Sequence, residues 1–379
     1  MVSDVPANRP GFIGQIPIRN IWLLMLYASE FFKQVENSKI QVEENPEDIP
    51  DLIAEILAAA VERRLRRNLS YGYIATHQVL NRVRGRIDIF TTERNQLLAR
   101  GKVACQFTEL TVDTIRNRYV RSALDEIAGI VSRPDLRRRC HTLAASMRRV
   151  GVTGARPSRS ELSLDRIGRH DHFDMHMLAV AHLAFDLALP TELAGSRFLS
   201  SPGRDEKWMR TLYEKAVAGF YNIVLEKRQW RVHAGRQMHW SIQDKSREID
   251  RILPAMRTDI ELDNIAEGYR IIIDTKFTSI LKKGWHRDET LSSQYMYQMY
   301  AYLRSQEGQG DPLAENASGL LLHPSVGEMI DESVEIQGHV IKFATVDLNA
   351  DAKAIRSRLV NIAYSFFTDT SNVRTQYAI

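Results

Sequence analysis

Residues 256–277 constrain the fold of this chain more than any other stretch. The first half alternates apolar and polar residues around Ile260 and Leu262, as a half-buried strand does. The second half contains the β-branched run 271–273, which is typical of a central strand. Residues 264–268 supply turn chemistry between the two halves. The stretch therefore predicts a β-hairpin.

The hairpin would bring Asp259 beside Asp274 and Lys276 at one edge of a sheet. Asp274 and Lys276 are two residues apart, so on a strand both side chains point to one face. Two carboxylates and an ammonium are costly there unless they bind a partner, and a divalent metal with a phosphodiester would supply one. Taken alone, the Asp-x-Lys spacing is a weak signal, because a surface hairpin with a salt bridge produces it too.

The chain has 379 residues, too many for one ordinary core, which predicts more than one domain. Helical patterns dominate the N-terminal half, and a Ser/Gly/Pro-bearing loop at 196–203 marks a boundary. The expected fold class is α/β (α+β). It combines a helical domain, residues 1–200, with a strand-rich basic protrusion at about 70–112, and a domain with a mixed central sheet flanked by helices, residues 201–379.

Basic residues are concentrated in residues 61–150, where 19 Lys and Arg stand against 8 Asp and Glu, and nearly all are arginine. This excess is larger than the net charge of +4 of the whole chain, so the remaining residues are net acidic. A localised arginine-rich segment suits phosphate or an acidic protein partner. For the cluster at 137–139, a solvated helix face is an equally good interpretation.

The cysteines and the N-terminal region indicate a cellular setting. Cys105 and Cys140 offer neither a disulfide framework nor a metal quartet, which favours a reducing, cytoplasmic environment. The apolar run 21–28 is too short to span a bilayer, and no basic leader or small-residue cleavage site accompanies it. We therefore expect no membrane association and no signal peptide.

Two further features flank the hairpin in sequence. Upstream, Glu214 lies in the middle of an expected helix at the edge of its apolar stripe, where it could supply a third carboxylate. Downstream, Gln298 and Tyr302 are four residues apart, which places them one turn apart on one helix face. The sequence thus contains four parts in order: a helix acid, a strand acid, a strand Asp-x-Lys and a helix Gln-x-x-x-Tyr. Any one part could occur by chance, but chance explains the whole series much less well.

At these residues the chain resembles the PD-(D/E)xK nuclease superfamily, in its Gln-x-x-x-Tyr, RecB-like branch. More narrowly, it resembles the McrC family, the nuclease subunits of the McrBC modification-dependent restriction system, over essentially its whole length. The matching segments, in order, are residues 16–20 (Ile-Pro-Ile-Arg-Asn), 24–28, 85–88 (Gly-Arg-Ile-Asp), 117–118, 212–215, 256–260, 273–277 and 294–302.

The resemblance implies a metal-dependent endonuclease that cuts double-stranded DNA as part of a type IV restriction system. The expected ligands of one or two Mg²⁺ ions are Asp259, Asp274, the carbonyl of Thr275 and Glu214. Lys276 would position the attacking water and stabilise charge on the phosphate. Gln298 and Tyr302 would organise the site or the bound strand.

The resemblance also implies a partner, an McrB-like AAA+ GTPase ring that reads 5-methylcytosine and translocates on DNA. The chain would insert its protrusion into this ring and stimulate GTP hydrolysis, with Arg86 and the neighbouring Arg84 as the expected contacts. Two alternatives stay open. The nuclease could work with a different AAA+ ring and without methylcytosine dependence, or the chain could be chiefly a non-catalytic activator of the ring.

Two other clusters are weaker signals. His170, His172 and His176 have helical spacing for a zinc site, but no acidic or cysteine ligand set surrounds them, so a helix N-terminus with exposed histidines is the better interpretation. Trp285 and His286 fit a DNA-facing loop and an ordinary exposed turn equally well.

Overall fold

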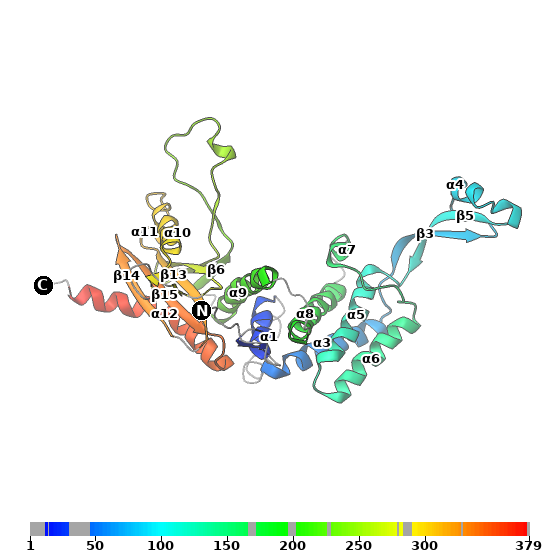
Figure 1. The fold of residues 1–379 in the computed structure, drawn as a ribbon, viewed down its shortest axis with the longest axis horizontal. Helices are drawn as coiled ribbons and strands as arrows, with labels where there is room; N and C mark the ends of the chain where they lie inside the picture. Colours follow the sequence, from blue (N-terminus) through cyan, green and yellow to red (C-terminus); the bar gives the residue numbers. More distant parts are fainter. Residues whose placement is uncertain are drawn as a thin grey trace, which may run out of the picture. The chain divides into compact units, whose positions relative to one another are not determined.

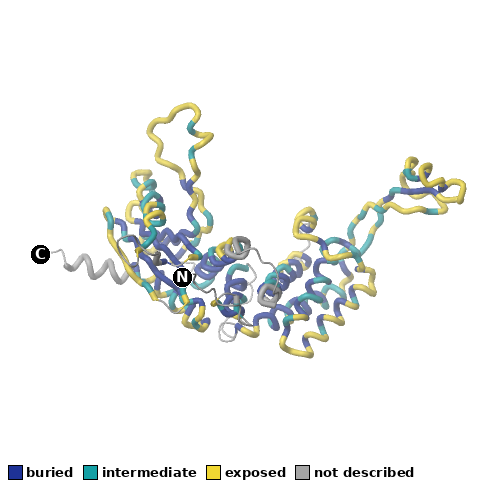
Figure 2. Tube along the Cα trace, in the orientation of Figure 1, coloured by how far each residue is buried: buried dark blue, intermediate teal, exposed yellow. Residues whose placement is uncertain are grey.

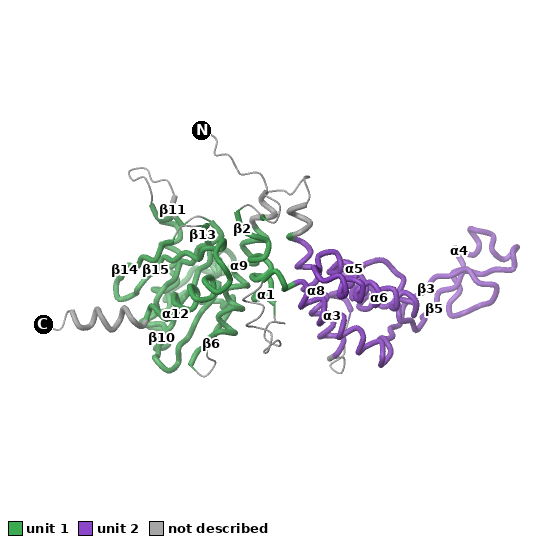
Figure 3. The backbone as a smooth tube through the Cα atoms, turned by 90° about the horizontal axis from the view of Figure 1, so that it is seen from below, with its two compact units in different colours: residues 1–49, 190–379 green, residues 50–189 purple. Residues whose placement is uncertain are grey.

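The chain folds into two compact units in the computed structural model (Figure 3). The described residues are 12–13, 15–29, 46–165, 172–195, 202–225, 229–278, 280–282, 290–326 and 329–376. Unit 1 comprises residues 1–49 and 190–379, and unit 2 comprises residues 50–189. Unit 2 is therefore an insertion, in sequence, into unit 1. The sequence assigned the first 49 residues to the helical domain, whereas contacts assign them to the unit that contains the sheet.

Unit 1 is built on a six-stranded mixed sheet (Figure 1). Its strands, in spatial order, are β14 (Asp331–Ile336), β15 (His339–Asp347), β13 (Ser318–Ser325), β10 (Tyr269–Thr275), β9 (Ile260–Asn264) and β6 (Trp230–Ala234). The pairs β10–β13 and β13–β15 are parallel, and the other neighbours are antiparallel. The predicted hairpin is confirmed as β9 and β10, with Ile260 opposite Ile273 and Glu261 opposite Ile272.

Helices cover both faces of this sheet, which confirms the expected mixed sheet flanked by helices. Ile341 and Phe343 of β15 belong to a buried cluster with Met299 of α10 (Ser293–Arg304). Lys342 lies between them and points the other way, because side chains alternate along a strand. Its Nζ donates to Ser365 Oγ of α12 (Ala352–Gln376) at 2.8 Å. The helices α10 and α12 therefore pack on opposite faces.

Two further helices of unit 1, α1 (Ile18–Ala28) and α9 (Pro202–Val224), pack closely against each other. Gly219 lies at their crossing, where a Cβ atom would overlap the carbonyl oxygen of Tyr27. The ring of Tyr27 meets that of Phe220 edge-on, with centroids 5.2 Å apart. Glycine at position 219 therefore sets the distance between the two helices.

Asn20 fastens α1 to the C-terminal part of the same unit. The residue is 1% exposed, and its Nδ2 donates to the carbonyls of Leu348 at 2.8 Å and Ala350 at 2.9 Å. A buried amide group that loses such partners destabilises a fold by about 1–3 kcal/mol. The segment 16–20, one of those that match the family, thus has a structural role at Asn20.

Unit 2 is helical and has a strand-rich protrusion. Its longer helices are α3 (Ile49–Arg66), α5 (Ile115–Ile130), α6 (Pro134–Arg149) and α8 (His172–Gly195). The protrusion contains β3 (Gly72–Leu80), β4 (Arg86–Ile87), α4 (Ile89–Arg94) and β5 (Val103–Thr111), with β5 between β3 and β4. Most of its residues are exposed (Figure 2). None of the helices in the described part of the chain is long and apolar enough to span a membrane.

Asn117 holds the base of the protrusion. It is fully buried in α5, and its Nδ2 donates to the carbonyls of Ser70 at 2.9 Å and Val112 at 2.8 Å, which flank β3 and β5. One side chain therefore joins the two ends of the protrusion to the helical body of unit 2. Asn117 belongs to segment 117–118, one of those that carry the resemblance, and its role in this structure is structural.

We expect Gly219→Ala to destabilise unit 1 by about 1–3 kcal/mol, because the added methyl group forces α9 away from α1. Thermal or urea unfolding of the purified chain measures the change. The matched control is Gly129→Ala on α5, where a Cβ meets nothing within 4 Å. That variant should be neutral or slightly more stable. Equal stability of the two variants would contradict the close packing of α1 and α9.

Candidate active site

The predicted acids and lysine lie together where β9 begins and β10 ends. Asp259 directly precedes β9, and its Oδ2 accepts hydrogen bonds from the backbone N–H of Thr275 at 2.8 Å and from Thr275 Oγ1 at 2.9 Å. Asp274 is 1% exposed and Lys276 5% exposed. The Lys276 Nζ lies 2.9 Å from Asp274 Oδ1 and 2.8 Å from Oδ2. The hairpin therefore brings Asp259, Asp274 and Lys276 into one site, as the sequence predicts.

The surroundings of Asp274 shift its proton affinity. Burial raises the pKa of this carboxyl to about 6, and the charge of Asp259 acts in the same direction. The ammonium of Lys276 opposes both effects without cancelling them. Removing a carboxylate from water disfavours its charged form, so the site gains from any additional positive charge.

A chain of hydrogen bonds from α10 holds Lys276 in position. The Lys276 Nζ donates to Gln298 Oε1 at 3.3 Å, Gln298 Nε2 donates to the hydroxyl of Tyr302 at 2.7 Å, and this hydroxyl donates to the carbonyl of Arg257 at 2.9 Å. Gln298 and Tyr302 thus lie at the same site as the hairpin residues. This series of hydrogen bonds connects Lys276 to the strand segment that leads into Asp259.

Tyr295 is a site residue that the sequence did not single out. Lys276 Nζ lies 5.1 Å from the centroid of its ring, within the range of a cation–π contact. The ring also lies next to His323 of β13, with centroids 5.9 Å apart, and His323 Nδ1 is 2.8 Å from the carbonyl oxygen of Thr278. Tyr295 is three residues before Gln298 on α10, so helical spacing is the signal that could have identified it.

Neighbouring carboxylates on this face each have a basic partner. Glu261 pairs with Arg236 at 2.9 Å, and Asp263 pairs with Arg270 at 2.6 Å. Asp259 differs, because among the described residues it has no Lys or Arg partner and receives only the two hydrogen bonds from Thr275. Among these carboxylates, Asp259 is therefore the one whose charge no ion pair within the described residues neutralises.

Glu214 lies on α9, as expected, and is half-buried. Burial raises the pKa of its carboxyl, and the charge of Asp259 raises it further, which indicates that the two acids are close enough to interact. The described residues contain no group of three or more His, Cys, Asp or Glu side chains that could hold a metal ion.

The donor set at the hairpin fits Mg²⁺. One oxygen of Asp259 is used by Thr275, and Asp274 Oδ2 has no hydrogen bond of acceptable geometry, although the lysine lies near it. Each carboxylate thus retains an oxygen that a cation can use. Mg²⁺ accepts one or two carboxylates and keeps several waters, so it does not require a third protein acid.

The two arginines predicted to contact a partner differ in their surroundings. The guanidinium of Arg84 lies 4.0 Å from the ring centroid of Phe107 and 3.5 Å from a carboxylate oxygen of Glu109, so it is held within the protrusion. Arg86 is exposed on β4, and no described residue forms an ion pair with it. Of the two, Arg86 is the one available to a partner.

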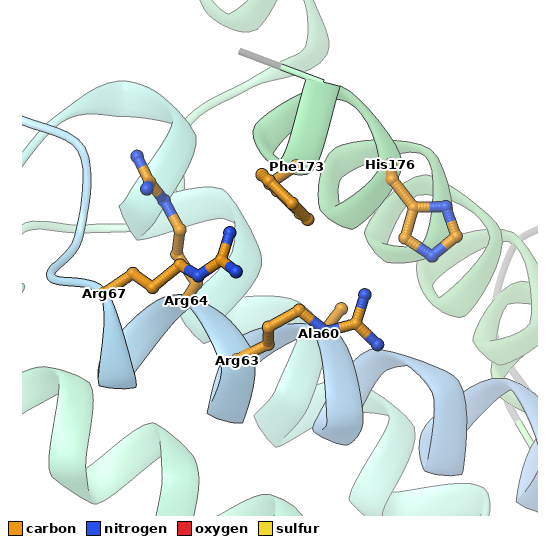
Figure 4. A pocket seen from close by; sticks show the side chains of 6 residues that line it. All are labelled: Ala60, Arg63, Arg64, Arg67, Phe173 and His176. Atoms are coloured by element: carbon orange, nitrogen blue, oxygen red, sulfur yellow. The ribbon is translucent and has the colours of Figure 1, made fainter.

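The two weaker signals of the sequence fall largely outside the described residues. His170, Trp285 and His286 lie outside them, as does the side chain of His172. His176 is half-buried on α8 and lines a pocket in unit 2 (Figure 4).

Comparison with known proteins identifies the family of this chain. A family model described as "McrBC 5-methylcytosine restriction system component" matches residues 7–324. The chain belongs to this family. Within the system it is the McrC component.

The chain is 24% identical over 349 residues to a protein of Escherichia coli (strain K12) named "Type IV methyl-directed restriction enzyme EcoKMcrBC", covering 92% of this chain and 97% of that protein. It is also similar, at 15% identity, to a solved half-complex of Thermococcus gammatolerans McrB AAA+ hexamers with bound McrC. That match covers 91% of this chain and 76% of the other, with a TM-score of 0.42. A second solved structure, the McrBC complex of the same organism, matches 49% of this chain and 61% of the other at 15% identity and a TM-score of 0.31.

In the metal-free protein we expect the carboxyl of Asp274 to titrate near pH 6, because burial raises its pKa to about that value. Carbon-13 NMR of aspartate-labelled protein measures the midpoint. Lys276→Gln should move the midpoint higher, since the opposing positive charge is lost. Lys245→Gln, at an exposed lysine of the same unit, should leave it unchanged. A midpoint near pH 4 in the parent protein would contradict the buried environment.

Proposed function

We propose that this chain is the nuclease subunit of its restriction system and hydrolyses phosphodiesters of double-stranded DNA with Mg²⁺. The observation that carries the proposal is the buried Asp274–Lys276 pair beside Asp259, held by Gln298 and Tyr302. A PD-(D/E)xK nuclease domain uses these residue types in this order. The relative from Escherichia coli is named a restriction enzyme, which fits the same activity.

In this proposal Asp259, Asp274 and the carbonyl of Thr275 would hold one or two Mg²⁺ ions. Bound there, Mg²⁺ would supply Lewis-acid polarisation of the phosphate and lower the pKa of a coordinated water. Both carboxyls must be deprotonated to bind a cation, so metal affinity should fall as the pH drops below about 6, where Asp274 gains a proton.

Lys276 would orient the attacking water and stabilise the negative charge that develops on the phosphate. Its ammonium is already fixed by Asp274 and by the hydrogen bond to Gln298, so little rearrangement is needed before reaction. Tyr302 acts through Gln298 and is a positioning residue. Glu214, whose pKa burial and the charge of Asp259 raise, would be an additional acid of the site.

We expect Asp259→Ala and Lys276→Ala each to reduce cleavage about 100-fold or more, the scale on which charge-stabilising groups contribute to catalysis. The assay is cleavage of duplex DNA that contains 5-methylcytosine, by the purified chain with its AAA+ partner, nucleotide and Mg²⁺. Asp250→Ala is the control, because Asp250 is exposed and pairs only with Lys245. Full cleavage by either active-site variant, with its fold intact, would refute the assignment.

A second proposed function, compatible with the first, is stimulation of an AAA+ ring by the protrusion. The observation that favours it is an exposed three-stranded protrusion that carries Arg86 without an ion-pair partner among the described residues. One related structure is described as McrB AAA+ hexamers with bound McrC, so a ring of that kind is the proposed partner. An arginine supplied to a nucleotide site stabilises transition-state charge.

We expect Arg86→Ala to abolish most of the stimulation of GTP hydrolysis, because an arginine in such a role contributes about 10³-fold or more. Phosphate release by the ring, with and without this chain, measures the effect. Arg94→Ala is the matched control, since Arg94 is an exposed arginine on the same protrusion. If stimulation by the Arg86 variant equals that of the control, Arg86 has no part in activation.

A further inference from the structure

Nine of the arginines described in unit 2 form ion pairs with carboxylates. The paired arginines are Arg64, Arg84, Arg116, Arg118, Arg133, Arg139, Arg148, Arg156 and Arg159. Arg63 and Arg67 are among the arginines that form no ion pair within the described residues, and the guanidinium of Arg67 lies 5.0 Å from the centroid of the Phe173 ring. No carboxylate of the described residues therefore neutralises these two arginines of the basic segment.

Arg63 and Arg67 meet at a pocket between α3 and α8 (Figure 4). Its lining consists of Ala60, Arg63, Arg64, Arg67, Phe173 and His176. The three arginines come from the end of α3 and the residue after it, and Phe173 and His176 come from the first turns of α8. The pocket thus combines guanidinium groups, one half-buried imidazole and one exposed aromatic ring.

A buried ion-pair network makes this pocket rigid. Asp174 is 1% exposed, and its two oxygens lie 2.8 Å from Arg64 Nε and 3.3 Å from Arg116 Nη1. Arg116 also pairs with Asp165 at 2.8 Å. The carboxylates of Asp165 and Asp174 are thus paired with Arg64 and Arg116 rather than with Arg63 or Arg67. The charges of Arg63 and Arg67 are left without a counter-charge among the described residues.

We propose that this arginine pocket binds phosphate groups of the DNA backbone. Arginine presents a planar fork of donors that matches phosphate, and the pocket is lined by arginine without lysine. Arg63 and Arg67 are one helical turn apart, so the two guanidiniums can contact successive phosphates of a single strand. DNA presents such a row of charges, whereas an isolated acidic side chain of a protein partner presents one.

The remaining side chains suit the same ligand. Phe173 is 47% exposed and lies against Arg67, where it can pack on a deoxyribose. Burial, and then the charge of Arg63, lower the pKa of His176, so the positive charge of the pocket comes from its arginines. The site contacts only the backbone, so it binds without regard to sequence. It rests on the proposed function only in taking DNA as the substrate.

The test is DNA binding by the full chain that carries both Arg63→Gln and Arg67→Gln. Fluorescence anisotropy with a labelled duplex, without Mg²⁺, gives the affinity over a range of salt concentrations. Each lost phosphate contact reduces the slope of log K against log salt by about 0.9, so the double variant should lose about 2. The charge-matched control carries Arg138→Gln and Arg149→Gln, at two exposed arginines of α6, and should keep the parent slope.

A second measurement needs no substitution. Phenylglyoxal modifies free guanidinium groups, and peptide mass spectrometry reports the extent at each arginine. Duplex DNA should protect Arg63 and Arg67 and leave Arg138 reactive. An unchanged salt slope in the double variant, absent protection, or no DNA binding by the parent chain would each overturn the proposal. If the double variant lost binding to the AAA+ ring but kept the DNA binding of the parent chain, the ligand of the pocket would be an acidic protein surface and the proposal would be overturned. Cleavage is not measured, so the proposed nuclease activity stands or falls separately.

Discussion

The antiparallel register of β9 and β10 is the constraint on which the candidate active site depends. Pairing of Ile260 with Ile273 and of Glu261 with Ile272 brings Asp259, just before β9, to the end of β10. A slip of one residue would turn Asp274 and Lys276 to the opposite face of the sheet, away from α10. The apolar residues of β10 would then exchange faces as well. The packing of the core and the position of the acids are therefore specified by the same pairing.

The site also depends on how charge is distributed over one face of the sheet. Farther along the strands, Arg270 bridges Asp263 and Asp311, and Arg236 neutralises Glu261, so these buried carboxylates are satisfied within the protein. At the end of the hairpin Lys276 lies beside two aspartates. Burial, and then the charge of Asp259, raise the pKa of Asp274 against the opposing charge of Lys276, and a divalent cation would offset both effects. Unit 2 has the reverse imbalance at its arginine pocket.

The sequence predicted those features of the fold that local patterns determine. The hairpin, the buried strand β10, the helices α9 and α10 and the strand-rich protrusion follow from periodicity and turn residues. The order of acid, Asp-x-Lys and Gln-x-x-x-Tyr identified the residues that meet at the site, because strand and helix periods fix which side chains share a face. The edge strand β14 was not predicted, since most of its residues are exposed and polar, and its pairing with β15 is a tertiary contact.

Other features depend on contacts between residues distant in sequence. Asn20 bonds to carbonyls about 330 residues away, and no local pattern contains that information. Likewise, the arginine count of residues 61–150 indicated a basic partner surface, but only the ion pairs show which arginines are structural. Helical spacing from Gln298 could have placed Tyr295 on the same face of α10. Its contact with Lys276, however, depends on how α10 packs on the sheet.

The insertion of unit 2 has a consequence for the order in which a growing chain can fold. The helix α1 leaves the ribosome first, but its partners α9 and the residues that bond Asn20 follow only after the whole of unit 2. Unit 2 has its own core and can fold during synthesis, as N-terminal units generally do. The parallel strands β10, β13 and β15 follow unit 2 in the chain, so the sheet that carries the acids is completed only after unit 2 has been synthesised. A chain interrupted before that point would hold the protrusion and the arginine pocket but no assembled acid–lysine site.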